Sequence, residues 1–493
     1  MSYPFCLGLR RAAALLLLTL VVPAQATAPA YKLRLAPYTT EGADGQPLVG
    51  ELGHFTVPEN RTRPNGTQIE LAFVRFRTTN SSPGVPLVYL VGGPGPSGID
   101  HCVGLATGRR LRVLDQCDVI ALDQRGTGRS RPNLEQGQHF PFELPLDRPL
   151  TRASFVAAYA AAVQRCVAHW QSAGVDLAAY NTRESAADVE DLRRALALDR
   201  IQLWGESYGT HLGLAVLRDF PEHISGATLV RVEGPDHTLK LPSTMQRHFE
   251  QMALLVAKDD GFAERFPDLL ATVRKLLAAL AEKPVTVEAL HQGQKVAITL
   301  GPFDLQYWLS NVLGLAFEFR DLPANLQRLV EGDWSMLAAH ALESRRSEVG
   351  SAMALMMDCS SGASPARLRR IAAEANDPAN LLGDAVNVPY PDIAAAAGSP
   401  DLGEAFRAPF RCDVPVLFVS GAFDARTPPE NVAEIAAGFP KHAHVVASSA
   451  GHESIERLDP GYRALQIDFL HGRPVQSRTL QLPPVRFRPL AGR

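Results

Sequence analysis

The stretch "RIQLWGESYGTHLGL", residues 200–214, decides the fold. An apolar run typical of a strand ends at Trp204, and a run typical of a helix begins after Ser207, which stands between Gly205 and Gly209. A G-x-S-x-G pattern between a strand and a helix is typical of a sharp turn that exposes a nucleophilic serine, because glycines relieve the crowding on both sides. The alternative is a tight turn in which the serine is incidental.

A catalytic serine needs partners elsewhere in the chain. Its hydroxyl is a poor nucleophile at neutral pH, so it requires a base, a carboxylate that orients the base, and donors for the oxyanion. After an elbow of this kind the acid and then the histidine follow on loops behind later strands. Asp424 follows the apolar strand expected at 414–424, and His452 follows the strand expected at 442–449. We therefore predict a catalytic triad of Ser207, Asp424 and His452, the alternative for Asp424 being a turn aspartate beside proline.

The oxyanion donors are predicted from the same geometry. One is the backbone N–H that follows the nucleophile, at Tyr208, and the other comes from the loop after an early strand. "VYLVGGPGPSG", residues 88–98, is that loop. Pro94 and Pro96 have no N–H to donate, so Gly93 is the predicted second donor. A phosphate-binding loop is the competing interpretation, but the stretch lacks the lysine-containing P-loop pattern and the dinucleotide pattern of glycines.

The order of elements predicts an α/β fold with a mostly parallel central sheet flanked by helices. Short β-branched runs alternate with helical stretches as far as about residue 235. The strands expected in this part are residues 69–79, 85–93, 118–126, 200–206 and 227–234, and the expected helices are residues 151–170 and 184–197.

The character of the chain changes in the middle. From about residue 236 to 400, helical segments surround one expected hairpin at 284–300, and strand character then returns. We interpret this part as a mainly helical cap inserted into the sheet fold. The expected organisation is a signal peptide at 1–26, a first core part at 27–235, the cap at 236–400 and a second core part at 401–493, which ends in a surface tail from residue 473.

The N-terminus predicts export. Arg10 and Arg11 precede an apolar run from Ala12 to Val22, and small residues follow up to Ala26, the expected cleavage site. The run is short of the roughly 20 residues that span a bilayer. We therefore expect a secreted or periplasmic protein whose mature form has no stable membrane span.

Composition excludes several classes of function. A formal net charge of −3, with 20% charged residues, leaves no basic excess for binding nucleic acid.

Removing Cys6 with the signal peptide leaves an odd number of cysteines, so at least one thiol is expected to be free or paired between chains. None has the CxxC spacing of a zinc or redox site, and we expect no metal and no cofactor. The five remaining cysteines are Cys102, Cys117, Cys166, Cys359 and Cys412, and the pairs considered are 102 with 117 and 359 with 412.

Five motifs in a fixed order carry a resemblance to a known family. They are "GGPGPSG" (92–98), "DQRGTGRS" (123–130), "GESYGT" (205–210), "SGAFDARTP" (420–428) and "GHES" (451–454). Together they resemble the proline iminopeptidase and tripeptidyl aminopeptidase group of serine α/β hydrolases, most strongly its exported bacterial branch. The family's triad falls on Ser207, Asp424 and His452, and the resemblance implies that Asp123 and Arg125 brace the floor of the active site.

The resemblance implies an exopeptidase that removes residues or short peptides from the N-terminus of peptide substrates through an acyl-enzyme. Such an enzyme must bind a free α-ammonium, for which a carboxylate near the acyl site is suited. Glu206, Glu233 and Asp236 lie at strand ends on the expected active-site side, and Glu233 and Glu206 are the candidate substrate-binding residues, although each could equally be a satisfied turn residue. The alternative function is an esterase or small-molecule amidase on the same triad, because a fold does not fix a substrate.

Overall fold

The computed structural model describes residues 31–42, 45–106, 113–135, 138–314, 319–452 and 460–489. The expected signal peptide at 1–26 lies outside these ranges. The described residues from Lys32 onward form one compact unit. None of the helices in the described ranges is long and apolar enough to cross a bilayer.

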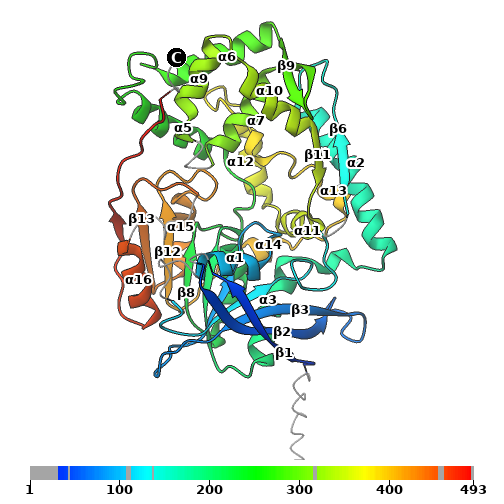
Figure 1. Cartoon of the computed structure of the whole chain (residues 1–493), viewed down its shortest axis with the longest axis vertical. Helices are drawn as coiled ribbons and strands as arrows, with labels where there is room; N and C mark the ends of the chain where they lie inside the picture. Colours follow the sequence, from blue (N-terminus) through cyan, green and yellow to red (C-terminus); the bar gives the residue numbers. More distant parts are fainter. Residues whose placement is uncertain are drawn as a thin grey trace, which may run out of the picture. The chain divides into compact units, whose positions relative to one another are not determined.

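A ten-stranded sheet forms the base of the described unit (Figure 1). Its strand order is β1-β2-β3-β5-β4-β7-β8-β12-β13-β14, and all pairs from β5 to β14 are parallel, whereas those among β1, β2, β3 and β5 are antiparallel. The mostly parallel sheet that the sequence predicted is confirmed. Its strands are β1 (Arg34–Glu41), β2 (Pro47–Pro58), β3 (Gln68–Phe76), β4 (Leu87–Leu90), β5 (Val119–Asp123), β7 (Ile201–Glu206), β8 (Ile224–Val230), β12 (Val416–Gly421), β13 (His442–Ala447) and β14 (Arg478–Leu480).

Helices pack on both faces of this sheet. They are α1 (Gly98–Ala106), α3 (Thr182–Ala195), α4 (Tyr208–Asp219), α15 (Glu430–Ile435) and α16 (Pro460–Leu470). Trp204 of β7 belongs to the apolar cluster that α1 and α16 share with the sheet. Because side chains alternate along a strand, Leu203 points to the opposite face, on which α4 packs against β7 and α3 packs against α4.

Polar caps set where the helices of the first part begin. The Thr151 hydroxyl accepts a hydrogen bond from the Ser154 N–H over 3.1 Å at the start of α2 (Arg152–Ser172). The Asn181 side chain accepts one from the Glu184 N–H over 3.1 Å at the start of α3. Each cap satisfies a backbone donor that has no partner within the helix, and both helices match the predicted segments closely.

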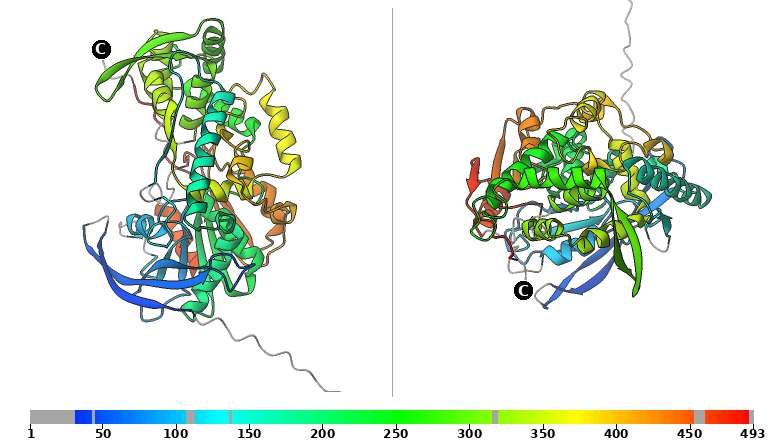
Figure 2. Two further views of the ribbon diagram at one scale, coloured as in Figure 1. Left: turned by 90° about the vertical axis from the view of Figure 1, so that its right-hand side faces the viewer. Right: turned by 90° about the horizontal axis from the view of Figure 1, so that it is seen from above.

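The chain between β8 and β12 is mainly helical and lies beyond the ends of the strands (Figures 1 and 2). Its helices are α5 (Pro242–Val256), α6 (Leu269–Glu282), α7 (Pro302–Val312), α9 (Leu322–Val330), α10 (Ser335–Arg345), α11 (Ala352–Ser361), α12 (Pro365–Ala375), α13 (Ala394–Ala397) and α14 (Glu404–Arg407). Strands β9 (Val285–His291) and β10 (Gln294–Leu300) form the predicted hairpin, whose turn at Gln292 and Gly293 has the two positive φ angles that a tight hairpin turn requires.

Elements from the first part of the chain also pack with these helices. Strand β6 (Phe140–Glu143) pairs with β11 (Arg346–Val349), and α2 packs against both strands and against α13. A fully buried ion pair, Arg345 with Asp304 at 2.8 Å, joins α10 to α7 within the same region. Two structured elements that precede β7 in sequence therefore pack with the inserted helices.

Asp123 and Arg125 tie the turn after β5 to its surroundings. The Asp123 carboxylate accepts hydrogen bonds from the Ser97 hydroxyl (2.7 Å) and from the N–H of Ile99 (3.0 Å), at the start of α1. The fully buried Arg125 guanidinium donates to both carboxylate oxygens of Asp188, at 2.7 and 2.8 Å. Both side chains are occupied by structural contacts, in line with the bracing role that the family resemblance implies.

The cysteine pairs considered from the sequence are wrong. Cys102, Cys117, Cys166, Cys359 and Cys412 are all buried free thiols. Cys102 and Cys117 both lie in the apolar cluster between the sheet, α1 and α16, where a thiol packs as a small hydrophobic group. Burial raises the pKa of each of these two thiols to about 12.

The predicted surface tail is structured in part. Arg478–Leu480 forms β14, which pairs in parallel with Val445–Ala447 at the edge of the sheet. A strand of three residues is too short to show the alternation of apolar and polar residues by which a strand is recognised in a sequence.

Close backbone approach explains the two glycines of the elbow. A Cβ atom on Gly209 would lie 2.0 Å from the carbonyl oxygen of Leu90, and one on Gly205 would lie 2.4 Å from the carbonyl oxygen of Gly209. The start of α4 therefore packs against β4 and β7 at a distance that only glycine permits.

Replacement of Gly209 by alanine tests this packing. Because the new Cβ meets backbone rather than a flexible side chain, we expect Gly209→Ala to lower the free energy of unfolding by about 3 kcal/mol or to prevent folding. Gly350→Ala is the matched control, since a Cβ there meets nothing within 4 Å. Urea denaturation of both variants gives the comparison, and a Gly209→Ala protein as stable as the control would contradict the packing described.

Candidate active site

Ser207 stands at the junction of β7 and α4 in a strained conformation. Its φ and ψ are 53° and −123°, a region that a residue with a side chain rarely adopts. Its N–H donates to the Val230 carbonyl oxygen over 3.0 Å, which holds the turn against β8. Strain of this kind is found where a side chain must be presented outward.

Three side chains from distant parts of the chain form a hydrogen-bonded series. His452 Nε2 lies 3.1 Å from Ser207 Oγ, and His452 Nδ1 lies 2.8 Å from Asp424 Oδ2. Asp424 follows β12, and His452 follows β13. The fold thus brings together the three residues that the sequence predicted as a triad, in the order serine, imidazole, carboxylate.

Asp424 is fully buried and remains a carboxylate. Burial alone would raise its pKa, but the His452 imidazole and hydrogen bonds from Thr427 outweigh burial and hold the pKa of Asp424 well below its usual range. The N–H groups of Arg426 (2.9 Å) and Thr427 (2.8 Å) donate to Oδ1, and the Thr427 hydroxyl donates to Oδ2 over 2.6 Å. A fixed carboxylate beside Nδ1 favours the tautomer in which Nε2 is free to accept the serine proton.

Of the two predicted oxyanion donors, Tyr208 adjoins Ser207 in the chain, and Gly93 lines the same cavity. Tyr208 is the first residue of α4, so its N–H is one of the donors that have no acceptor within the helix. Gly93 has a φ of 121° and lines the same cavity as Ser207. The adjacent Gly92 lies so close that a Cβ on it would be 2.9 Å from the Ser207 Cβ.

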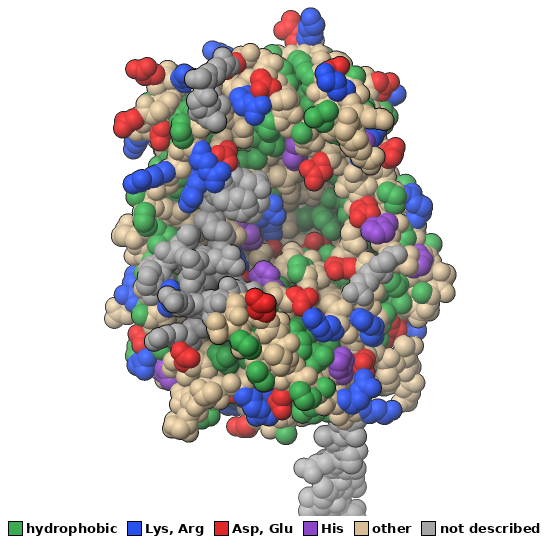
Figure 3. All heavy atoms as spheres, in the orientation of Figure 1, with side chains coloured by type: hydrophobic (Ala, Val, Ile, Leu, Met, Phe, Trp, Pro, Cys, Tyr) green, Lys and Arg blue, Asp and Glu red, His purple; other side chains and the backbone are tan. Residues whose placement is uncertain are grey.

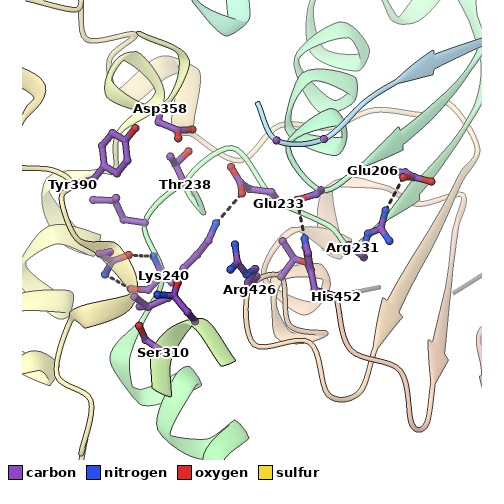
Figure 4. A pocket seen from close by; sticks show the side chains of 18 of the residues that line it. Glu206, Arg231, Glu233, Thr238, Lys240, Ser310, Asp358, Tyr390, Arg426 and His452 are labelled. Atoms are coloured by element: carbon purple, nitrogen blue, oxygen red, sulfur yellow. Dashed lines mark hydrogen bonds and ion pairs between the residues drawn. The ribbon is translucent and has the colours of Figure 1, made fainter. Parts of the chain in front are cut away.

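Ser207 and His452 open on a cavity of about 800 Å³. Residues of the sheet loops line one side, and residues of the inserted segment, including Asn311, Asp358 and Tyr390, line the other. Figure 3 shows the surface hollowed on this face between the inserted helices and α1. Figure 4 shows the side chains that converge on the cavity from both sides.

Glu206 is held on the sheet side of the cavity. Its Oε2 accepts hydrogen bonds from an Arg231 nitrogen (2.7 Å) and from the Tyr89 hydroxyl (3.2 Å). Its Oε1 is buried and has no hydrogen-bond partner within the described residues. Arg231, like Ser207, has a positive φ, of 60°.

Glu233 also lines the cavity, and its Oε2 accepts a hydrogen bond from Lys240 Nζ over 2.7 Å. Burial would raise the pKa of Glu233, but Lys240 and His211 lower it overall. The third acid considered from the sequence, Asp236, instead accepts hydrogen bonds from the N–H and hydroxyl of Ser364, both at 2.6 Å, at the start of α12. Asp236 therefore binds Ser364, the capping residue at the N-terminus of α12.

The sequence analysis missed four charged residues of the cavity, namely Arg231, Lys240, Asp358 and Arg426. Asp358 lies on α11, and burial together with nearby Glu233 raises its pKa to about 8. Arg231 directly follows β8, and Arg426 lies in the turn that carries Asp424, but nothing in their local sequence shows that their side chains enter the cavity. Asp358 reaches the cavity only because the inserted segment packs over the sheet.

Three other histidines, His211 on α4 and His442 and His444 on β13, make contacts outside the hydrogen-bonded series. His211 Nδ1 lies 3.1 Å from the Gly234 carbonyl oxygen and its Nε2 lies 3.0 Å from the Ser361 hydroxyl. His444 Nε2 lies 3.0 Å from the Ser420 hydroxyl, and His442 Nδ1 lies 2.7 Å from the Phe439 carbonyl oxygen.

A family model matches most of the chain. Residues 85–457 match the family described as alpha/beta hydrolase fold. This range includes the elbow, the inserted segment and the turns that carry Asp424 and His452.

Three curated relatives are similar over shorter stretches. Serine protease Hip1 of Mycobacterium tuberculosis is 29% identical over 221 residues, which are 42% of this chain and 42% of the relative. Tripeptidyl aminopeptidase of Streptomyces coelicolor is 28% identical over 252 residues, 48% of this chain and 46% of the relative. Proline iminopeptidase of Neisseria meningitidis is 25% identical over 160 residues, 32% and 36% of the two chains. The matched part spans less than half of the length of each relative.

The raised pKa of Asp358 predicts a pH-dependent stability. Folded protein keeps the Asp358 proton up to about pH 8, whereas the unfolded chain loses it near pH 4. Between these values the folded state binds one proton more than the unfolded state, so this carboxyl lowers stability as pH rises. Asp358→Asn removes the effect, and we expect the stability of the variant relative to wild type to increase from pH 5 to pH 8.

Urea denaturation at pH 5 and pH 8 measures this difference. Asp147→Asn, at an exposed carboxylate, is the matched control. A stability difference between Asp358→Asn and wild type that is the same at both pH values would contradict the assignment.

Proposed function

Because the chain belongs to the alpha/beta hydrolase fold family, we propose that it is a serine aminopeptidase that releases N-terminal residues or short peptides through an acyl-enzyme. The observation that carries the proposal is the series Ser207, His452 and Asp424, joined at 3.1 and 2.8 Å and opening on a cavity with acidic side chains. The peptidase names of the relatives support a peptide as the substrate.

In the proposed acylation step, Ser207 Oγ attacks the carbonyl carbon of the scissile peptide bond while His452 Nε2 takes the serine proton. Asp424 keeps the imidazole oriented and stabilises its positive charge. The N–H groups of Tyr208 and Gly93 stabilise the oxyanion of the tetrahedral intermediate. His452 then gives its proton to the leaving amine as the C–N bond breaks, which leaves the N-terminal fragment as an ester on Ser207.

In the proposed deacylation step, water takes the place of the leaving amine. His452 removes a proton from the water as its oxygen attacks the ester carbonyl, and it returns that proton to Ser207 Oγ as the ester bond breaks. The product is a free amino acid or short peptide with its own carboxylate. The residues of the chain supply all proton transfers, so the scheme uses no metal and no cofactor.

We propose that Glu233 accepts the α-ammonium of the substrate. Lys240 occupies its Oε2, and a carboxylate with two oxygens can accept further hydrogen bonds. Asp358, on the opposite wall of the cavity, adds a second carboxyl group to the same region. Glu206 is the other candidate, but its free oxygen is buried, so it is better suited to hold Arg231 in place.

The inserted helices support a preference for short peptides. They cover the side of the cavity opposite the sheet loops, so a folded protein would meet these helices before its backbone reached Ser207. We also propose that the protein is exported through the N-terminal segment at 1–26 and acts on peptides outside the cytoplasm.

Replacement of the nucleophile tests the mechanism. We expect Ser207→Ala to lower kcat by about four orders of magnitude or more while the protein stays folded, because the covalent intermediate cannot form. Asp424→Asn should also lower kcat strongly, since the amide favours the wrong imidazole tautomer. Peptide turnover and circular dichroism measure activity and folding, and near-normal activity in either variant would exclude the proposed role.

The choice between free and blocked N-termini tests the substrate class. We expect kcat/KM for a peptide with a free N-terminus to exceed that for its N-acetyl counterpart. Glu233→Gln should reduce the ratio of these two kcat/KM values by about 10- to 100-fold, because a charge-assisted hydrogen bond is lost. Equal turnover of the two peptides by wild type would end the aminopeptidase proposal. Ester turnover without cleavage of any peptide would select the esterase alternative.

A further inference from the structure

Three lysine or arginine side chains line the cavity with Ser207, and two of them have carboxylate partners. Arg231 lies 2.7 Å from Glu206, and Lys240 lies 2.7 Å from Glu233. Arg426 is the third, and it forms no ion pair with any described residue. Its Nε–H is buried and has no hydrogen-bond partner within the described chain.

An unpaired guanidinium in a cavity is costly unless a ligand meets it. Arginine remains charged at every physiological pH and carries five N–H donors in a planar fork. A half-buried cation without a counter-charge loses part of its hydration and gains no protein partner in exchange. The charge of Arg426 is therefore available to a bound anion, which would recover that loss.

The Arg426 side chain is held in position rather than free to swing. Its backbone N–H donates to Asp424 Oδ1 over 2.9 Å, so it shares the turn that carries the acid. Its stem lies on Gly314, where a Cβ would be 2.5 Å from Nε and 3.1 Å from Cγ. The absence of a side chain at Gly314 makes the space that Arg426 occupies.

Figure 4 shows where the guanidinium lies among the other side chains. It projects into the cavity between His452 on one side and the Lys240 and Glu233 pair on the other. A peptide bound with its scissile bond at Ser207 and its ammonium at Glu233 would therefore pass beside Arg426.

We propose that Arg426 binds a carboxylate of the substrate, so that the enzyme prefers short peptides bearing a negative charge close to the cleaved bond. A guanidinium and a carboxylate match in geometry and can form two parallel hydrogen bonds. The carboxylate has two sources, the C-terminus of a short peptide or an aspartate or glutamate side chain within it. This proposal rests on the proposed function in one respect, namely that the substrate is a peptide.

Binding to an inactive protein tests the proposal without turnover. In the Ser207→Ala background, calorimetry compares two pairs of peptides with free N-termini: a short peptide acid with its C-terminal amide, and a peptide amide containing glutamate with its glutamine counterpart. We expect the charged member of one pair to bind about 10- to 100-fold more tightly, and that pair identifies the source of the carboxylate. Adding Arg426→Gln should bring the ratio to about 1, and Arg426→Lys should keep part of it, because lysine preserves the charge but not the fork.

Two further variants separate recognition from general damage. Arg148→Gln, at an exposed arginine that pairs with Asp147, should leave the ratio unchanged. Gly314→Ala should lower the ratio of the two peptide affinities although Arg426 is still present, because the new Cβ displaces the Nε and Cγ atoms of Arg426. This variant replaces Arg426→Gln in the test if Arg426→Gln does not fold.

The proposal is overturned if neither pair shows a preference in the Ser207→Ala protein, or if the preference survives Arg426→Gln. This result is separate from failure of the proposed function, which shows in turnover as equal cleavage of free and acetylated peptides. A carboxylate preference that depends on Arg426 would stand even if the aminopeptidase proposal fell.

Discussion

The contact between Gly209 and the Leu90 carbonyl is the constraint on which the site depends. It brings the first turn of α4 against β4, and the β7–α4 junction at Ser207 then becomes a turn with a positive φ. The loop after β4 returns to the same junction, where a Cβ on Gly92 would lie 2.9 Å from the Ser207 Cβ. Close backbone packing on both sides of Ser207 thus sets the direction in which the serine points.

The turn after β12 positions two further side chains of the site. Asp424, Arg426 and Thr427 belong to one short turn whose N–H groups fold back onto the Asp424 carboxylate. The inward carboxylate orients His452, and the side chain of Arg426 leaves the same turn toward the cavity. The proposed catalytic acid and the proposed carboxylate-binding residue therefore have a fixed relation, because a shift of one requires a shift of the backbone that carries the other.

Features of the fold that depend on neighbouring residues could be predicted from the sequence, whereas features that depend on residues far apart in the chain mostly could not. The elbow, the buried parallel strands and the capped helices are local patterns, and the structure contains all of them near the expected residues. The approach of Asp424 and His452 to Ser207 also follows, because strand order and chain order together place their loops at one end of the sheet. The pairing of β6 with β11 and the edge strand β14 left no local signal, since they are short and are stabilised by partners far away in the chain. The same holds for Asp358 and Arg426, whose surroundings arise only when the inserted helices pack over the sheet.

The charges of the cavity connect these parts to the proposed activity. Glu206 pairs with Arg231, and Glu233 pairs with Lys240. Arg426 is then the cation of the cavity that has no carboxylate partner within the described residues, and a substrate carboxylate would supply one. The most direct measurement uses a pair of peptide diphenyl phosphonates that differ only in a free or acetylated N-terminus, with inactivation rates measured on the wild-type protein and the adduct located by peptide mapping. The account predicts that the free-amine reagent inactivates about tenfold or more faster, with the phosphonate attached to Ser207. Equal rates for the two reagents, or an adduct on any other residue, would contradict it.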